Sequence, residues 1–185
     1  MTVIGGTSGF TVVRMKAEDV LEIVGLLQER GVRLWIDGGW GVDALLGEQT
    51  RDHTDLDLAV EMDDRDSYEA AVAKAGFKFL YQDGPLNWVV KDDRGREIDV
   101  HLVDTTVELT DPNGKQVYGG IPYDVGCFAG TGVVGGAEVR CCTAEFQMTS
   151  HTGYEISETD VDDIAALHQR FGLPIPDIYT DLIDT

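Results

Sequence analysis

Two aspartates one residue apart in an apolar run constrain this chain more than any other feature. The run is Asp55-Leu56-Asp57-Leu58-Ala59-Val60, and its composition predicts a β-strand. Side chains alternate along a strand, so Asp55 and Asp57 share one face and the leucines take the other. Carboxylate oxygens are the ligands that Mg²⁺ prefers. The run therefore predicts a divalent-cation site on a rigid strand.

A third carboxylate is needed to complete such a site, and the strand predicted over residues 97–103 offers one. In that strand Glu97, Asp99 and His101 alternate with apolar residues and share a face. We expect Asp99 to join the metal set, with Glu97 as the second candidate and His101 beside them. Two such ions, about 3.5–4 Å apart, would suit phosphoryl transfer. Asp99 could also accept a proton from a hydroxyl acceptor, and both roles stay open.

A glycine pair precedes the aspartates and predicts a phosphate-binding turn. Gly38 and Gly39 follow an apolar strand over residues 32–36 and begin a short helix. Glycine lets the backbone approach a phosphate closely, and a helix start offers free N–H groups. Arg51 and His53 stand just ahead of the aspartates, where either could touch phosphate or simply belong to a surface loop. The combination favours a nucleoside triphosphate as the substrate.

Composition excludes several classes of protein. The net charge is −20 over 185 residues, which argues against a nucleic-acid partner because such surfaces need clustered Lys and Arg. No apolar run is long enough to predict a membrane span, and no signal peptide is evident. Cys127, Cys141 and Cys142 match neither a disulfide framework nor a zinc site. We expect a cytoplasmic protein.

The remaining pattern predicts a single domain over residues 1–185. Residues 1–15 are expected to be a poorly ordered extension, residues 17–104 a catalytic core, and residues 105–185 acceptor-shaping loops and C-terminal helices. Helical spacing predicts helices over 17–30, 40–46, 66–75, 143–150 and 158–171, the last capped by Ser157. Strands are expected over 32–36, 56–61, 77–82, 86–91, 97–103 and 138–142. The Gly- and Pro-rich stretch 105–134 predicts loops with short strands.

These motifs together resemble the DNA polymerase beta-like nucleotidyltransferase superfamily. Within it the closer resemblance is to the small lincosamide nucleotidyltransferases, with the aminoglycoside 2″-adenylyltransferases as relatives. The resemblance is carried by four stretches in the same order: residues 35–43, residues 51–57, residues 98–101, and His151-Thr152-Gly153-Tyr154 followed by Asp160 and Asp163.

The resemblance implies an α+β nucleotidyltransferase fold, with a mixed twisted β-sheet and helices packed mainly on one face. It also implies Mg²⁺, with two ions expected, and ATP as the co-substrate, whose AMP is transferred to a hydroxyl of a small antibiotic. Asp55, Asp57 and Asp99 fall on the family's catalytic acidic positions, and Gly38 and Gly39 on its phosphate turn. Three further residues are expected to touch the acceptor: His101, His151 and Tyr154.

Several functions remain compatible with the sequence. A lincosamide acceptor is favoured by the motifs, and an aminoglycoside acceptor is the nearest alternative. The same chemistry could also act on a protein or another acceptor. The alternative that is not an enzyme is a nucleotide-binding module without catalysis. The presence of all three carboxylates weighs against it.

Overall fold

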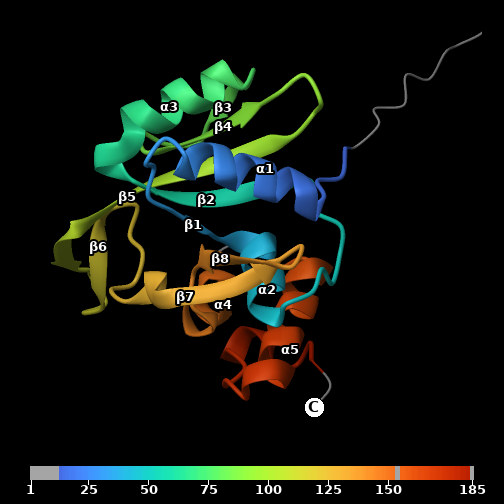
Figure 1. The fold of residues 1–185 in the computed structure, drawn as a ribbon. Coiled ribbons are helices and arrows are strands. Elements are labelled where there is room, and N and C mark those ends of the chain that lie inside the picture. The colour runs from blue at the N-terminus through green and yellow to red at the C-terminus, as the bar shows by residue number, and fades with distance from the viewer. Residues whose placement is uncertain (1–12, 153–154, 184–185) are drawn as a thin grey trace, which may run out of the picture.

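The computed structural model describes residues 13–152 and 155–183 of the chain (Figure 1). Its helices are α1 (Ala17–Gln28), α2 (Gly38–Leu46), α3 (Arg65–Lys74), α4 (Ala144–Ser150) and α5 (Glu158–Phe171). Its strands are β1 (Leu34–Ile36), β2 (Asp55–Glu61), β3 (Lys78–Gln82), β4 (Asn87–Lys91), β5 (Glu97–Thr110), β6 (Gln116–Gly120), β7 (Gly130–Val134) and β8 (Ala137–Cys141). The predicted helices and strands are confirmed, with ends that differ by a few residues.

The strands form one mixed sheet in the order β3-β4-β5-β2-β1-β8-β7, and β6 pairs with the outer part of β5. The pairs β2–β5 and β1–β8 are parallel, and the other pairs are antiparallel. In Figure 1, α1 and α3 lie together above the central strands, and α4 and α5 lie together below them. This arrangement confirms the predicted α+β class with a mixed sheet.

Alternating side chains fix the register of the central strands. Leu56, Leu58 and Val60 of β2 are fully buried in the main core. So are three apolar residues of β5, namely Ile98, Val100 and Leu102. Burying one leucine side chain stabilises the fold by about 1.5–3 kcal/mol. A register shift of one residue would expose these apolar side chains and bury the carboxylates instead. The same register therefore keeps Asp57 and Asp99 on the face away from α1 and α3.

The C-terminal helix begins and ends as its sequence predicts. The Ser157 hydroxyl accepts a hydrogen bond from the Asp160 amide, and the Asp160 carboxylate accepts one from the Ser157 amide. This capping box satisfies two N–H groups at the helix start. Gly172 ends the helix with a φ of 68°. At 14 residues α5 is too short to cross a bilayer, and the same holds for every other helix among the described residues.

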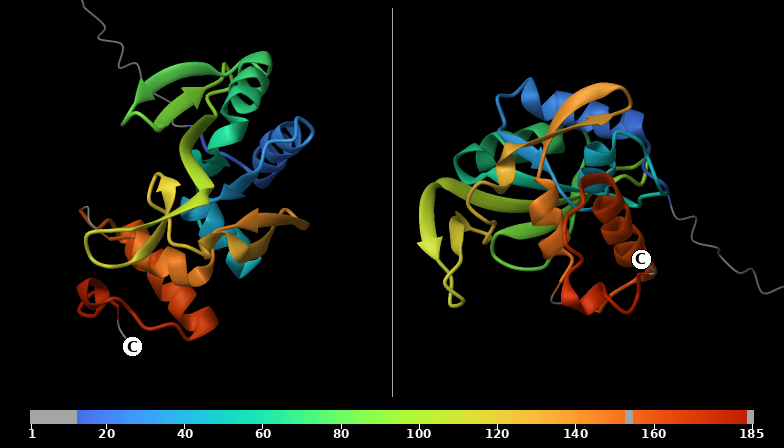
Figure 2. Two further views of the ribbon diagram at one scale, coloured as in Figure 1. Left: turned by 90° about the vertical axis from the view of Figure 1, so that its left-hand side faces the viewer. Right: turned by 90° about the horizontal axis from the view of Figure 1, so that it is seen from below.

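The stretch 105–134 is more regular than its composition predicts. β5 continues to Thr110, where it pairs with β6, and β7 begins at Gly130. Glycines serve here as close-packing positions: a Cβ at Gly132 would lie 2.2 Å from the carbonyl oxygen of Ala44 in α2. The views in Figure 2 show the β5–β6 ribbon projecting from the rest of the sheet. The predicted short strands are thus confirmed by β6 and β7, whereas the prediction is wrong for residues 105–110, which continue β5.

The predicted N-terminal extension falls largely outside the described residues, which begin at residue 13. Its last residue, Met15, is buried, and its amide donates to the carbonyl oxygen of His53 at 2.8 Å. Met15 thus packs against the loop that leads into β2.

Candidate active site

The parallel pairing of β2 and β5 brings two predicted acidic residues together. Asp57 is the register partner of Asp99, and Asp55 is the register partner of Glu97. Neighbouring strands lie about 4.8 Å apart, so the carboxylates on this face are close enough to interact. Burial of its carboxyl group, together with the charges of Asp55 and Asp37, raises the pKa of Asp57 to about 8. The raised pKa shows that these carboxylates repel one another and that His101 offsets this repulsion only in part.

The acidic cluster fits a hard divalent cation in its chemistry. All of its donor atoms are carboxylate oxygens, and Oδ1 of Asp99 is buried with no hydrogen-bond partner among the described residues. Within residues 13–152 and 155–183, however, no three His, Cys, Asp or Glu side chains already converge as a metal-binding group. The assignment of Asp55, Asp57 and Asp99 as metal ligands stays a prediction.

The glycine pair packs directly on the predicted site residues. Gly38 has a φ of 55°, and a Cβ placed there would lie 2.1 Å from Oδ2 of Asp57. A Cβ at Gly39 would lie 2.3 Å from Nη2 of Arg51 and 2.6 Å from Nδ1 of His53. Any side chain would therefore displace the groups that flank the turn. The turn thus lies between the acidic cluster and the guanidinium group of Arg51.

Arg51 is held by groups from two helices. Its Nε and Nη2 donate to the two carboxylate oxygens of Asp163 in α5, at 3.0 and 2.8 Å. Its Nη1 donates to Nδ1 of His53 at 3.0 Å, so that nitrogen carries no proton. His53 is buried, and its Nε2–H donates to Asp43 of α2 at 2.5 Å. His53 therefore lies behind Arg51 and orients it.

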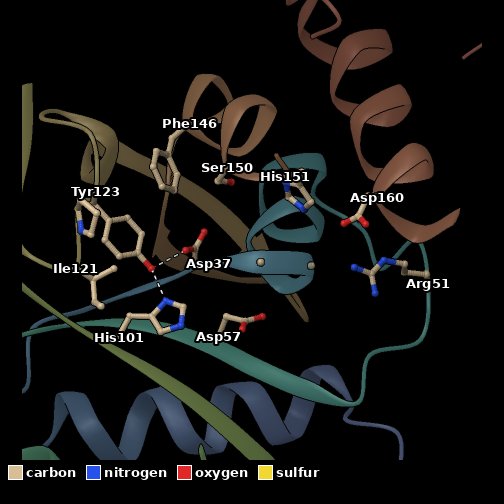
Figure 3. Close-up of a pocket in the computed structure, with 13 residues that line it drawn as sticks. Asp37, Arg51, Asp57, His101, Ile121, Tyr123, Phe146, Ser150, His151 and Asp160 are labelled. Atoms are coloured by element: carbon tan, nitrogen blue, oxygen red, sulfur yellow. Dashed lines mark hydrogen bonds between the residues drawn. The ribbon is translucent and has the colours of Figure 1, made fainter. Parts of the chain in front are cut away.

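A second hydrogen-bonded chain joins β5 to the start of α2 (Figure 3). The Tyr123 hydroxyl donates to Oδ2 of Asp37 at 2.7 Å and accepts from Nδ1 of His101 at 2.8 Å. Gln147 donates to the other oxygen of Asp37 at 3.0 Å. Nε2 of His101 lies 3.5 Å from Oδ1 of Asp99. Burial alone would lower the pKa of His101, but the neighbouring carboxylates, chiefly Asp99, raise it above its usual range.

These groups surround a cleft of about 420 Å³. Figure 3 shows His101 and Tyr123 at one end, Arg51 and Asp160 at the other, and Asp37 and Asp57 between them. Its full lining is Asp37, Gly38, Gly39, Arg51, Asp57, His101, Ile121, Pro122, Tyr123, Phe146, Ser150, His151 and Asp160.

Six of the predicted site residues line this cleft: Gly38, Gly39, Arg51, Asp57, His101 and His151. Asp55 and Asp99 lie beside Asp57 without lining the cleft, and His53 lies behind Arg51. Tyr154 lies outside the described residues. The structure thus brings most of the predicted set to one place.

Sequence reasoning missed the residues that reach the site from distant segments. Tyr123 hydrogen-bonds Asp37 across 86 positions, and Gln147 reaches it across 110. Asp37 and Asp43 could be interpreted from sequence either as helix caps or as supporting groups around the site. Neither caps α2 through its side chain, and both instead hold site residues by hydrogen bonds. No local pattern marks Tyr123 or Gln147, because their place depends on how β8 and α4 pack beside β1.

The fold has well-matched relatives among solved structures. A lincosamide antibiotic adenylyltransferase with lincomycin bound superposes with a TM-score of 0.71 at 24% identity, covering 84% of this chain and 98% of that one. An aminoglycoside enzyme of the ANT(2″)-Ia type, in complex with adenylyl-2″-tobramycin, gives a TM-score of 0.66 at 22% identity, covering 83% of this chain and 87% of that one. Both are nucleotidyltransferase structures, and they establish the fold.

Sequence comparison agrees with the fold. The lincosamide resistance protein of Staphylococcus haemolyticus is 27% identical over 154 residues, covering 81% of this chain and 92% of that protein. A 2″-aminoglycoside nucleotidyltransferase of Escherichia coli is 41% identical over 59 residues, about a third of either chain. The family model for aminoglycoside-2″-adenylyltransferases matches residues 19–167, most of the chain. The chain belongs to the aminoglycoside-2″-adenylyltransferase family of nucleotidyltransferases.

Proposed function

We propose that this enzyme transfers AMP from ATP to a hydroxyl group of a small antibiotic, with a lincosamide as the favoured acceptor. The observation that carries the proposal is the register pairing of Asp57 with Asp99 beside the Gly38–Gly39 turn. In the proposed enzyme the acidic residues would bind the cation and the adjacent glycine turn would bind the phosphates. Membership of an adenylyltransferase family supports the same chemistry.

The donor half of the cleft would hold the triphosphate. The Cβ positions of Gly38 and Gly39 are already taken up by Asp57 and Arg51, so the phosphates would reach the turn beside these side chains, with Arg51 supplying a positive charge next to Gly39. Asp55, Asp57 and Asp99 would hold Mg²⁺, which when bound neutralises charge on the phosphate oxygens. Without that cation, the acidic cluster would repel the triphosphate.

The reaction needs one proton acceptor beside the α-phosphate. The acceptor hydroxyl oxygen forms a bond to the α-phosphorus, the bond to the β-phosphate oxygen breaks, and pyrophosphate leaves. Asp99 is our candidate to take the hydroxyl proton, because it is the register partner of Asp57, which lines the cleft. The alternative is that Asp99 serves only as a metal ligand.

The acceptor half of the cleft has an apolar wall made of Ile121, Pro122 and Phe146. The carboxylate beside this wall already has partners, because Asp37 accepts hydrogen bonds from Tyr123 and Gln147. An acceptor with an apolar body and few positive charges suits such a wall better than a polycation does. This composition supports a lincosamide, as does the long match to the lincosamide resistance protein of Staphylococcus haemolyticus.

An acceptor panel tests the proposal. Pyrophosphate release from Mg·ATP is measured with lincomycin, clindamycin, tobramycin and kanamycin, each against a reaction without acceptor. We expect release with the two lincosamides and a mass increase of the antibiotic by one AMP. Absence of turnover with every antibiotic, in protein that binds ATP, would remove the antibiotic as substrate and leave a protein or other acceptor.

The aminoglycoside alternative has one specific observation in its favour. A 2″-aminoglycoside nucleotidyltransferase of Klebsiella pneumoniae is 44% identical to this chain over 55 residues, whereas the lincosamide resistance protein is 27% identical over 154 residues. With a net charge of −20, the chain would also attract polycationic antibiotics, although salt screens charges beyond about 8 Å. Faster turnover of tobramycin than of lincomycin in the panel would favour this alternative.

A further inference from the structure

The ion pair between Arg51 and Asp163 joins parts of the chain 112 positions apart. Asp163 belongs to α5 and is only 2% exposed, whereas Arg51 belongs to the loop before β2 and lines the cleft. A buried carboxylate is costly unless it is paired, so this contact places α5 and the loop relative to each other. The sequence motif that contains Asp163 has no role in the chemistry described so far.

Among the residues that the structure describes, the contacts of Arg51 leave one N–H of its guanidinium group without a partner. Of its five N–H donors, two are used by Asp163 and one by His53. A fourth points to the carbonyl oxygen of Asp52 at a long 3.5 Å. The remaining donor is on Nη2, the atom that lies 2.3 Å from the Cβ position of Gly39. The available donor is thus on the atom nearest the glycine turn.

Two supports hold this orientation from opposite sides. Asp163 binds the Nε–Nη2 edge of Arg51 in a two-point contact, which fixes the plane of the group. His53, itself held by buried Asp43, binds the third nitrogen. Nε2 of His151, a residue that lines the cleft, lies 3.8 Å from Oδ2 of Asp163. A flexible arginine is therefore pre-oriented before any ligand arrives, which lowers the entropic cost of binding.

We propose that Asp163 is a positioning residue for the nucleotide: it holds Arg51 so that the free Nη2–H faces a phosphate seated at the Gly38–Gly39 turn. The proposal rests on the proposed function, since it takes a nucleoside triphosphate as the ligand. It assigns a role in donor binding to a residue of the C-terminal helix. Asp163 acts through Arg51 and does not touch the reacting atoms.

The test compares Asp163→Asn with Asp162→Asn by calorimetric titration with Mg·ATP and, separately, with the acceptor that the panel identifies. Asp162 is the matched control because it is an exposed aspartate on the same helix. We expect Asp163→Asn to weaken Mg·ATP binding roughly tenfold or more, the effect of losing a charge-assisted contact, and to change acceptor binding less than about twofold. Asp162→Asn should bind both ligands as the unmodified protein does.

A double-mutant cycle separates positioning from general damage to the fold. If Asp163 acts through Arg51, then adding Asp163→Asn to Arg51→Met should cause no further loss of Mg·ATP affinity. An equal loss in both backgrounds, or an unchanged affinity in the single Asp163→Asn variant, would overturn the proposal. Circular dichroism and thermal melting establish that each variant is folded.

A second variant covers the case in which Asp163→Asn does not fold. Arg51→Lys keeps the positive charge beside Asp163 but cannot bond that carboxylate at two points and also donate to His53. We expect it to weaken Mg·ATP binding by a similar factor, and unchanged affinity would contradict the proposal. Failure of the unmodified protein to bind Mg·ATP would instead refute the proposed function, so the two failures are distinguishable.

Discussion

Asp57 and Asp99 are register partners across the parallel strands β2 and β5, and both carboxylates face away from the helices α1 and α3. This single relationship joins two stretches of sequence 42 positions apart into one acidic surface. Gly38 packs against this surface. Only glycine fits there, because a Cβ atom at this position would lie 2.1 Å from Oδ2 of Asp57. The predictions below follow from this arrangement.

The raised pKa of Asp57 predicts how stability depends on pH in the absence of metal. The folded protein holds a proton on Asp57 up to about pH 8, whereas the unfolded chain loses it near pH 4. Between these values the folded state binds more protons, so its free energy of unfolding must fall as pH rises. The total effect is on the order of a few kcal/mol.

Thermal melting in EDTA at pH 5, 6, 7 and 8 measures this dependence. We expect a slope that Asp57→Asn reduces, with the variant more stable than the unmodified protein at pH 8. Mg²⁺ should also reduce the slope, because a bound cation compensates the ionised carboxylates. Parallel curves for the two proteins would show that Asp57 titrates normally.

Gly38→Ala should damage both folding and activity. Its φ of 55° is strained for alanine, and the added methyl group would collide with Asp57. Together the strain and the collision should cost roughly 2–4 kcal/mol of unfolding free energy. Chemical denaturation measures the change.

Gly25→Ala is the matched control, because Gly25 lies inside α1 with nothing within 4 Å of its Cβ position. It should stabilise the protein by about 0.5–1 kcal/mol, since alanine is the better helix former. Equal effects of the two substitutions would mean that the turn does not pack on the acidic cluster.

Tyr123→Phe isolates one hydroxyl group. The phenyl ring can still pack on Phe128 and Phe146, but Asp37 and His101 lose their shared partner. We expect a loss of about 1–2 kcal/mol in stability and roughly a tenfold fall in kcat, with the KM for ATP little changed. Steady-state kinetics with ATP and acceptor varied separately measures the split. A fall in ATP affinity alone would place Tyr123 on the donor side instead.

Phe146→Leu tests the apolar wall of the acceptor half. Leucine retains most of the buried apolar volume but removes the ring face that lines the cleft. The KM for lincomycin should rise about three- to tenfold while the KM for ATP stays the same. A matched change at Phe79, an exposed residue of β3, should leave both constants unaltered.

The face of each acidic residue could be predicted from sequence because strand alternation is local. In both strands, apolar residues that are buried alternate with the aspartates Asp55, Asp57 and Asp99. The carboxylates must therefore lie on the opposite face of the sheet. Helix starts such as Ser157 follow local rules in the same way. These are the parts of the account that the structure confirms.

The supporting residues could not be predicted, because they depend on packing between distant segments. Tyr123 reaches Asp37 only since residues 121–129 pack against β1, and Asp163 reaches Arg51 only since α5 packs on α2. No periodic pattern of apolar residues in the sequence indicates either contact. The extension of β5 to Thr110 was not predicted for a related reason: the glycines of the β5–β6 ribbon indicate turns locally, but Gly119 fits close strand packing in the fold.

The measurement that tests the central claim most directly is pyrophosphate release from Mg·ATP in the presence of lincomycin. It compares the unmodified protein with Asp57→Asn, and Asp162→Asn is the control. The account predicts Mg²⁺-dependent release by the unmodified protein and the control, and a loss of at least about a thousandfold in Asp57→Asn with its fold intact. Release by Asp57→Asn at a rate near that of the control would contradict the assignment of the acidic pair as the catalytic centre.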